Sequence, residues 1–192
     1  MTKSASHQNT IFKAGGSPKV RTSWLVLCVC VSAMLMIFGA KLRYNIGGML
    51  PITFQSVVLC LSALFCGRLV GFYAQVLYLF LGLFLPVFSS DVLSGVAFYQ
   101  TVNGSFVLMF PLSAFFCGSY GHQKWHFIWL LGTVFCTHLL ILAAGFCGMF
   151  FIHKLGFEVA LQNAFIGLLP AAAFKSVCIA LFYGLFGYAN SR

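Results

Sequence analysis

The chain has 192 residues, of which 61% are hydrophobic and 7% are charged, and its mean hydropathy is +0.99. Soluble proteins carry about 25% charged residues, and two acids, Asp91 and Glu158, with 11 Lys and Arg cannot build such a surface. The net charge of +9 forms no basic patch alternating with polar residues, which argues against a nucleic-acid partner. The composition therefore predicts an all-α integral membrane protein with one compact domain.

Residues 1–22 are polar and basic and predict a disordered cytoplasmic tail, followed by a single transmembrane domain over residues 23–192. Gly67 and Arg68 separate two short apolar stretches and predict a tight helical hairpin. Residues 152–169 are semi-polar and predict a surface or partly re-entrant segment, with Pro170 at the start of the last helix. At roughly 20 residues per span, six transmembrane helices are expected, over residues 23–40, 51–66, 69–85, 105–120, 125–151 and 170–189.

The distribution of Lys and Arg predicts the orientation. With the N-terminus inside, the cytoplasmic side receives Lys3, Lys13, Lys19, Arg21, Arg68, Lys124 and Arg192. The outside receives only Lys41, Arg43 and Lys154. We therefore expect an N-in/C-in, multi-pass protein of the cell membrane. The outer face then holds the longest and most polar connections, 41–52, 86–104 and 152–169, and is the expected binding face.

Lys175 falls within the last predicted span. A lysine at the centre of a spanning helix costs about 2.5–3.5 kcal/mol on insertion scales. Its long stem could carry the ammonium to the outer headgroups. Alternatively, Lys175 lies at the bottom of an outward-facing pocket and binds an anionic group of a ligand, because no acid shares its helix. Both interpretations stay open on the sequence alone.

Thr53 and Gln55 open the second predicted span, where hydroxyl and amide groups need hydrogen-bond partners. Thr53 is suited to cap the helix. Gln55 lies deeper, is less suited to capping and is therefore expected to meet a polar ligand.

An aromatic segment over residues 78–88 (YLFLGLFLPVF) ends the third predicted span at Pro86. Phe88 begins a connection that also holds Tyr99 and Asn103. Aromatic rings with a few amides suit a small amphipathic ligand. An aromatic belt at the membrane interface is the alternative.

The eight cysteines all lie in apolar runs without a C-x-x-C pair, which predicts packing rather than disulfide, redox or metal chemistry. His122 and His126 are expected to anchor an interface rather than bind a metal. His138 is expected to be a buried histidine, with a proton relay as the alternative. The sequence contains no P-loop and no catalytic constellation, so we expect no enzyme, no cofactor and no metal, and any transport energy must come from partner subunits.

Two segments together resemble the BioY family, the biotin-specific substrate-binding (S) subunits of energy-coupling-factor (ECF) transporters. Residues 47–55 (GGMLPITFQ) resemble the family's P-x-P-[IF]-T-[LF]-Q segment, and residues 78–88 resemble its Y-L-x-L-G-x-x-G-x-P-V-F segment. Residues 110–114 and 169–175 also fall where the family has similar segments. The resemblance covers about residues 24–188.

The resemblance implies a six-helix S-subunit bundle with both termini in the cytoplasm and a biotin pocket near the outer face. It implies that Thr53, Gln55, Tyr78 and Lys175 line or support this pocket, to which the residue-level argument adds Phe88 and Asn103. It also implies a transmembrane coupling subunit and ATPase subunits as partners. The coupling subunit is expected to dock on the small-residue face of the first helix, marked by Cys28, Ser32 and Ala33.

Two positions depart from the family pattern. The family's P-x-D-x-x-K has Ala172 in place of the acid, and its T-G-G-Y is represented by residues 103–106 (NGSF). The leading hypothesis is biotin uptake across the cytoplasmic membrane. The alternatives are transport of a related carboxylated compound, lipoate or dethiobiotin, or a membrane thiol-redox or enzyme protein.

Overall fold

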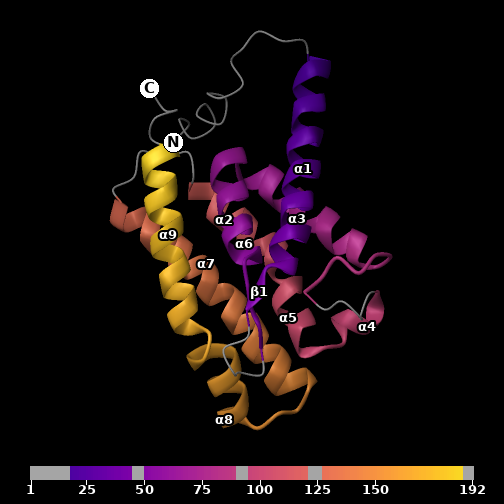
Figure 1. The fold of residues 1–192 in the computed structure, drawn as a ribbon, viewed down its shortest axis with the longest axis vertical. Coiled ribbons are helices and arrows are strands. Elements are labelled where there is room, and N and C mark those ends of the chain that lie inside the picture. The colour runs from indigo at the N-terminus through magenta and orange to yellow at the C-terminus, as the bar shows by residue number, and fades with distance from the viewer. Residues whose placement is uncertain (1–17, 45–49, 90–94, 121–126, 188–192) are drawn as a thin grey trace, which may run out of the picture.

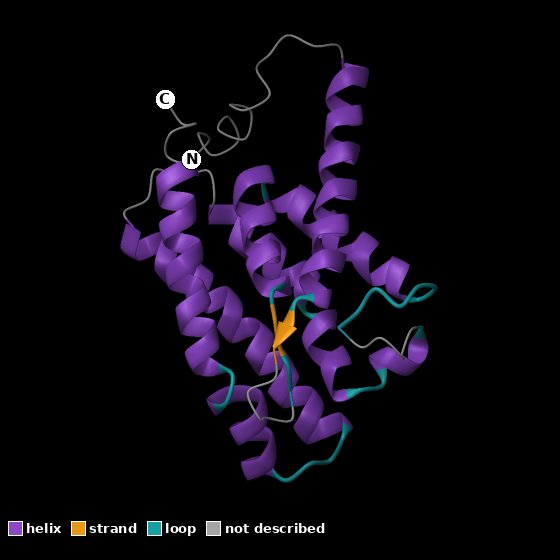
Figure 2. Cartoon of the chain, viewed as in Figure 1, coloured by secondary structure: helices purple, strands orange, loops and turns teal. Residues whose placement is uncertain are grey.

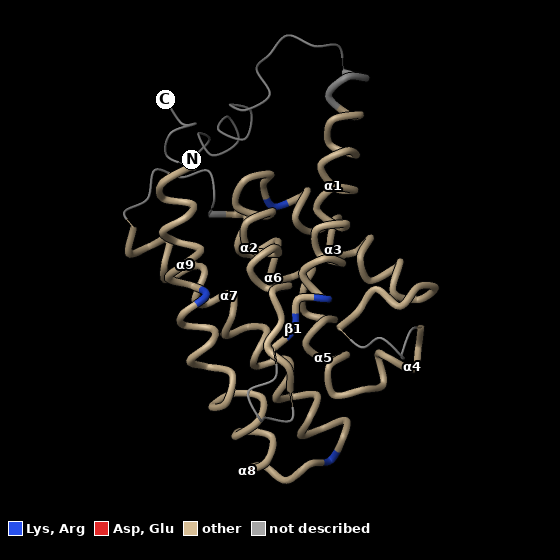
Figure 3. Tube along the Cα trace, in the orientation of Figure 1, with Lys and Arg blue, Asp and Glu red and all other residues tan. Residues whose placement is uncertain are grey.

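The protein is mostly helical (Figures 1 and 2), in a computed structural model that describes residues 18–44, 50–89, 95–120 and 127–187. Within these residues, four helical stretches are long and apolar enough to cross a membrane. They are Thr22–Lys41, Val102–Ser119, Phe127–Ile152 and Phe157–Phe186. Large hydrophobic side chains such as Met34, Phe38 and Phe174 are exposed on them, as expected for helices that face lipid. Lys and Arg are sparse along the described helices (Figure 3).

The first helix, α1 (Pro18–Lys41), begins earlier than the predicted boundary at residue 23. Proline suits the first turn of a helix because the amide hydrogen that it lacks has no partner there. Residues 1–17, most of the predicted tail, lie outside the described part of the chain. After α1, the two-residue strands β1 (Arg43–Tyr44) and β2 (Ile52–Thr53) pair antiparallel, with Arg43 opposite Thr53.

The predicted hairpin is present as α2 (Gln55–Cys66) and α3 (Arg68–Gly82). Gly67 joins them at φ 89°, a backbone conformation that other residues rarely adopt. At 12 and 15 residues, the two helices are about 18 and 22 Å long, against a bilayer core of about 30 Å. The six apolar helical regions therefore occur in the predicted order, but two are shorter than a span, and a count of six spanning helices stays a prediction.

The fourth predicted span is built from α5 (Val102–Leu108) and α6 (Phe110–Tyr120), preceded by the short helix α4 (Val96–Tyr99). The break at Met109 comes two residues before Pro111, whose missing amide hydrogen cannot continue the ladder of helix α5. Helix α6 packs against α2 and α3 in the middle of the bundle. Helix α5 packs against α7 (Phe127–Cys147).

Residues 152–169 are more helical than predicted. Helix α7 continues as the π-helix η2 (Gly148–Ile152), and the chain then forms α8 (Phe157–Ala160), the π-helix η3 (Leu161–Ile166) and α9 (Leu169–Gly187). Pro170 is the second residue of α9, close to its predicted place. Glu158 lies in the first turn of α8, where a carboxylate is favourable, so the semi-polar residues do not prevent a helix.

The start of α1 and the end of α9 lie at one end of the molecule, and α8 lies at the opposite end (Figure 1). This arrangement is compatible with termini on one side of the membrane. Helices α7 and α9 pack against each other along one side of the bundle, and α1 packs against α2 and α3. The paired strands lie between these two groups, and the residues next to them line the cavity described below.

Candidate functional site

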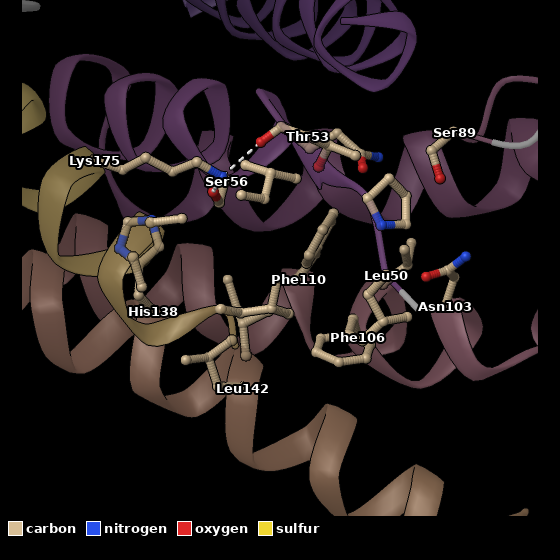
Figure 4. Close-up of a pocket in the computed structure, with 18 residues that line it drawn as sticks. Leu50, Thr53, Ser56, Ser89, Asn103, Phe106, Phe110, His138, Leu142 and Lys175 are labelled. Atoms are coloured by element: carbon tan, nitrogen blue, oxygen red, sulfur yellow. Dashed lines mark hydrogen bonds between the residues drawn. The ribbon is translucent and has the colours of Figure 1, made fainter. Parts of the chain in front are cut away.

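A cavity of about 90 Å³ lies between the β1–β2 hairpin, α2, α5, α7 and α9 (Figure 4). This volume holds several water molecules, since a cavity needs roughly 10–15 Å³ for each water. Most lining residues are apolar, and a few polar groups converge on the cavity, which is the usual make-up of a small-molecule site. The lining residues are Leu50, Pro51, Ile52, Thr53, Gln55, Ser56, Ser89, Asn103, Phe106, Val107, Phe110, His138, Ile141, Leu142, Leu168, Ala171, Ala172 and Lys175.

Lys175 reaches this cavity from α9. Its Nζ donates hydrogen bonds to the carbonyl oxygen of Thr53 at 2.6 Å and to Ser56 Oγ at 3.3 Å. The ammonium is therefore held inside the bundle against the start of α2, rather than extended toward the lipid headgroups. Among the residues that the structure describes, none that lines the cavity carries a carboxylate. The site thus presents a partly buried cation whose described partners are both neutral.

Thr53 and Gln55 both line the cavity, with different roles. The N-cap of α2 is Phe54 and no side chain caps this helix, so Thr53 does not serve as the predicted cap. Its carbonyl, rather than its hydroxyl, makes the bond to Lys175. Gln55 is buried, and its Nε2 donates to the hydroxyl of Tyr78 at 2.6 Å.

Tyr78 supports the site from behind the cavity wall. It is fully buried and does not line the cavity, and its hydroxyl donates to the carbonyl of Val87 at 3.3 Å. Since the same hydroxyl accepts the hydrogen bond from Gln55, Tyr78 connects α2 to the segment after α3. Its hydrogen bonds fix the position of Gln55 at the cavity edge.

Phe88 lies in the protein core and not in the cavity wall. It is fully buried and stacks on Phe98 with ring centroids 3.9 Å apart, and it meets Tyr78 edge-on at 5.4 Å. Gly82 makes this packing possible, since a Cβ there would lie 1.9 Å from Phe88 Cζ. The ring of Phe88 therefore stabilises the wall that holds Tyr78, and the structure does not place it against a ligand.

Asn103 lies at the far end of the cavity from Lys175, beside Ser89 (Figure 4). The segment that holds Ser89 is hydrogen-bonded to the end of α1 and to β1. Lys41 Nζ donates to the carbonyl of Pro86 at 3.0 Å, and Arg43 donates to the carbonyl of Ser89. Tyr99 adds a hydrogen bond to the carbonyl of Leu79 at 2.5 Å, and burial raises the pKa of this hydroxyl to about 12. The hairpin and the segment after α3 therefore close this end of the cavity together.

His138 and Ser56 were not among the predicted binding residues, but both line the cavity. His138 is 4% exposed, and its Nδ1 lies 3.0 Å from the carbonyl of Val134 and 3.1 Å from Ser176 Oγ. Its Nε2 is buried without a hydrogen-bond partner in the described structure. A histidine in an apolar helix carries no sequence signal for which face it occupies, so only the packing of α7 on α9 identifies it.

The small-residue face of α1 is turned inward. Ser32 and Ala33 are buried, Cys28 is half-buried, and the exposed face carries large side chains such as Leu27, Val31 and Met34. Small residues allow helices to approach closely, and here they do so where α1 packs against α2 and α3 within the chain. This face therefore does not present its small residues to a coupling subunit.

The other predicted chemistry is not brought together. All eight cysteines are free thiols, and none lines the cavity. No cluster of three or more potential metal ligands occurs in the described ranges. His122, His126 and Asp91 lie outside those ranges.

Comparisons with known proteins identify the family and the fold of the chain. The family model for the BioY family matches residues 8–188. Among solved structures, the chain is similar to a crystal structure of the S-component for biotin from an ECF-type ABC transporter, with a TM-score of 0.76 and 15% identity over 87% of this chain and 92% of that chain. At this identity the likeness shows a shared fold. No match is found among curated proteins. Because the family model covers nearly the whole chain, this protein belongs to the BioY family.

Proposed function

We propose that this protein is the substrate-binding subunit of an ECF-type biotin transporter in the cytoplasmic membrane. The observation that carries the proposal is the convergence of Thr53, Gln55, Asn103 and Lys175, from four separate elements, on one mainly apolar cavity. Biotin has an apolar ring and chain with a polar group at each end. A cavity with an apolar middle and polar groups at both ends suits that distribution.

The proposal assigns a role to each part of the site. Lys175 and Gln55 contact polar groups of the ligand, while Asn103 contacts the opposite end. Tyr78 and Phe88 act indirectly, by holding Gln55 and the wall behind it. The hairpin before α2 and the segment at Ser89 cover the cavity, so we expect the ligand to enter there, from the outer side of an N-in/C-in bundle.

Transport requires partners in this proposal, because the sequence has no P-loop with which to use ATP. A transmembrane coupling subunit and ATPase subunits supply the energy. Since the small residues of α1 are buried within the chain, we expect docking through large apolar side chains or through a different helix. The protein itself catalyses no reaction in this account.

The alternative ligands are lipoate and dethiobiotin. Ala172 places a methyl group in the cavity wall near Lys175, where the family pattern has a carboxylate, so the polar set for biotin is altered. Dethiobiotin keeps the ureido group of biotin and lipoate lacks it. Binding of the two compounds therefore tests whether the site recognises that group. A thiol-redox function receives no support from the cavity, because no cysteine lines it.

Uptake of labelled biotin by a biotin-auxotrophic host tests the proposal. Cells that produce the protein with coupling and ATPase subunits should accumulate biotin above the empty-vector level, and a Lys175→Met variant present at equal level in the membrane should not. Uptake at the vector level by the wild-type protein, verified in the membrane, would contradict the proposal. If the protein preferred lipoate to biotin in competition, lipoate would replace biotin as the proposed ligand.

A further inference from the structure

The imidazole of His138 has one satisfied nitrogen and one buried nitrogen for which the described residues supply no partner. Nδ1 lies 3.0 Å from the carbonyl of Val134, which can only accept, so Nδ1 carries a proton. Ser176 Oγ donates its own hydrogen to the carbonyl of Ala172 at 2.8 Å and lies 3.1 Å from Nδ1. Its oxygen therefore also accepts from Nδ1. These contacts fix the ring between α7 and α9.

Nε2 is then a hydrogen-bond acceptor, and no donor among the described residues reaches it. A second proton on the ring would place a cation in the same cavity as the ammonium of Lys175, and none of the described lining residues carries a carboxylate to offset it. The neutral ring keeps its lone pair on Nε2, which is buried without a hydrogen-bond partner among the described residues. A buried acceptor without a donor is unfavourable, so this atom requires a donor from outside the described chain.

Lys175 provides the complementary group at the same end of the cavity (Figure 4). Thr53 and Ser56 take two of its three N–H donors, which leaves one for a ligand. Lys175 and His138 therefore offer one N–H donor and one nitrogen acceptor at this end of the cavity. A carboxylate presents only acceptors and would leave Nε2 unpaired. A cyclic urea or lactam presents a carbonyl oxygen next to an N–H and satisfies both groups.

We propose that His138 is a specificity-determining ligand contact of this chain, whose Nε2 accepts a ureido N–H while Lys175 donates to the adjacent carbonyl oxygen. The inference rests on the proposed binding of biotin and adds an orientation to it. The ureido ring lies at the Lys175 end, and the carboxylate lies toward Asn103 and Ser89. Nε2 supplies an acceptor in the part of the wall where Ala172 supplies none.

Two substitutions separate the atoms of the ring. His138→Asn keeps a donor near the place of Nδ1 and removes the acceptor at the place of Nε2, whereas His138→Gln extends to that place and keeps an acceptor there. Thr137→Val is the matched control, because Thr137 is next to His138 in sequence, is buried and does not line the cavity. Its hydroxyl donates to the carbonyl of Thr133 at 2.8 Å. The experiment measures the binding of biotin and of its two ureido N-methyl derivatives to the purified full-length protein, together with the melting temperature without ligand.

We expect His138→Asn to weaken biotin binding about tenfold, the value of one lost hydrogen bond, and His138→Gln to weaken it less. The wild-type protein should prefer biotin to one N-methyl derivative by at least about tenfold. His138→Asn should reduce this preference, and Thr137→Val should preserve it.

Wild-type binding of biotin with no change in His138→Asn, at an unchanged melting temperature, would overturn the role of His138 and leave the proposed function intact. If His138→Asn unfolds, equal binding of biotin and both N-methyl derivatives by the wild-type protein would overturn it in the same way. Absence of any biotin binding by the wild-type protein would overturn both the function and this inference.

Discussion

Two clusters of polar side chains in the apolar interior differ in how completely their hydrogen-bond donors and acceptors are paired. At the α2–α3 side, Gln55 donates to Tyr78, and Tyr78 donates to the carbonyl of Val87. At the α7–α9 side, Lys175 bonds to Thr53 and Ser56, but His138 Nε2 in the same cavity has no described partner. The first group connects protein to protein and stabilises the wall. The second cluster keeps one N–H of Lys175 and the acceptor Nε2 of His138, for which the described residues supply no partner, to bind a ligand.

This contrast separates the residues that line the cavity from the residues that support its wall. Gln55 and Lys175 both line the cavity, but Gln55 Nε2 donates to the buried hydroxyl of Tyr78 behind the wall. Lys175 bonds to Thr53 and Ser56 and has a third N–H to donate. Substitutions of Tyr78 and Phe88, which do not line the cavity, should therefore lower stability more than affinity. Substitutions at the α7–α9 end should lower affinity more than stability.

The largest effect is expected from Phe88→Ala, which removes a core side chain behind the cavity wall. The ring is fully buried against Phe98 and Tyr78, so its removal should lower the free energy of unfolding by about 3–5 kcal/mol. Thermal unfolding of the purified protein measures the loss. The matched control is Phe84→Ala, because Phe84 is 69% exposed and should change the melting temperature far less in detergent. Equal effects of the two substitutions would contradict the core role of Phe88.

Lys175→Met removes the ammonium group at the α7–α9 end of the cavity. A hydrogen bond to a charged group contributes about 1.5–3 kcal/mol, so biotin affinity should fall about 10- to 100-fold. Direct binding to the purified protein measures the change. Met keeps most of the apolar stem, and the ligand-free melting temperature should stay close to that of the wild type. Unchanged affinity would place the ligand elsewhere.

Tyr78→Phe sharpens the contrast, because it removes one hydroxyl behind the cavity wall. Gln55 Nε2 and the carbonyl of Val87 would each lose a partner, which should cost about 1–3 kcal/mol of stability. Biotin affinity should change by no more than a few-fold. A large loss of affinity with unchanged stability would show that Tyr78 contacts the ligand directly.

The smallest effect is expected from Gln75→Met, outside both groups. Gln75 on α3 is fully buried, does not line the cavity, and neither polar atom of its side chain has a described hydrogen-bond partner. An apolar side chain of similar shape should raise the free energy of unfolding by about 1 kcal/mol and leave biotin binding unchanged. A drop in the melting temperature would indicate that a water molecule or another group pairs with this amide.

Much of the fold follows from local sequence. Long apolar stretches predict the helices, Gly67 predicts the hairpin between α2 and α3, and Pro170 marks the start of α9. Residues 157–166 are helical although they hold Glu158, Gln162 and Asn163, because helical hydrogen bonds form within the segment itself. Polarity alone therefore did not distinguish a helix from a surface loop there.

The site depends more on packing than the fold does. Lys175 stands out in the sequence because a cation in an apolar helix is costly. His138 does not, since its role depends on the rotation of α7 against α9. Phe88 was expected near the ligand because of its aromatic character. Its ring instead packs in the core, because Gly82 has no side chain to occupy that space. The inward turn of Ser32 and Ala33 is likewise a property of the assembled bundle.

The central claim is that this cavity binds biotin through Lys175. Thermal unfolding of the purified full-length protein, titrated with biotin and in parallel with lipoate, tests it most directly. We expect a saturable rise in melting temperature with biotin, little or none with lipoate, and a strongly reduced rise for Lys175→Met. An absence of stabilisation by biotin, or an equal rise in Lys175→Met, would contradict the account.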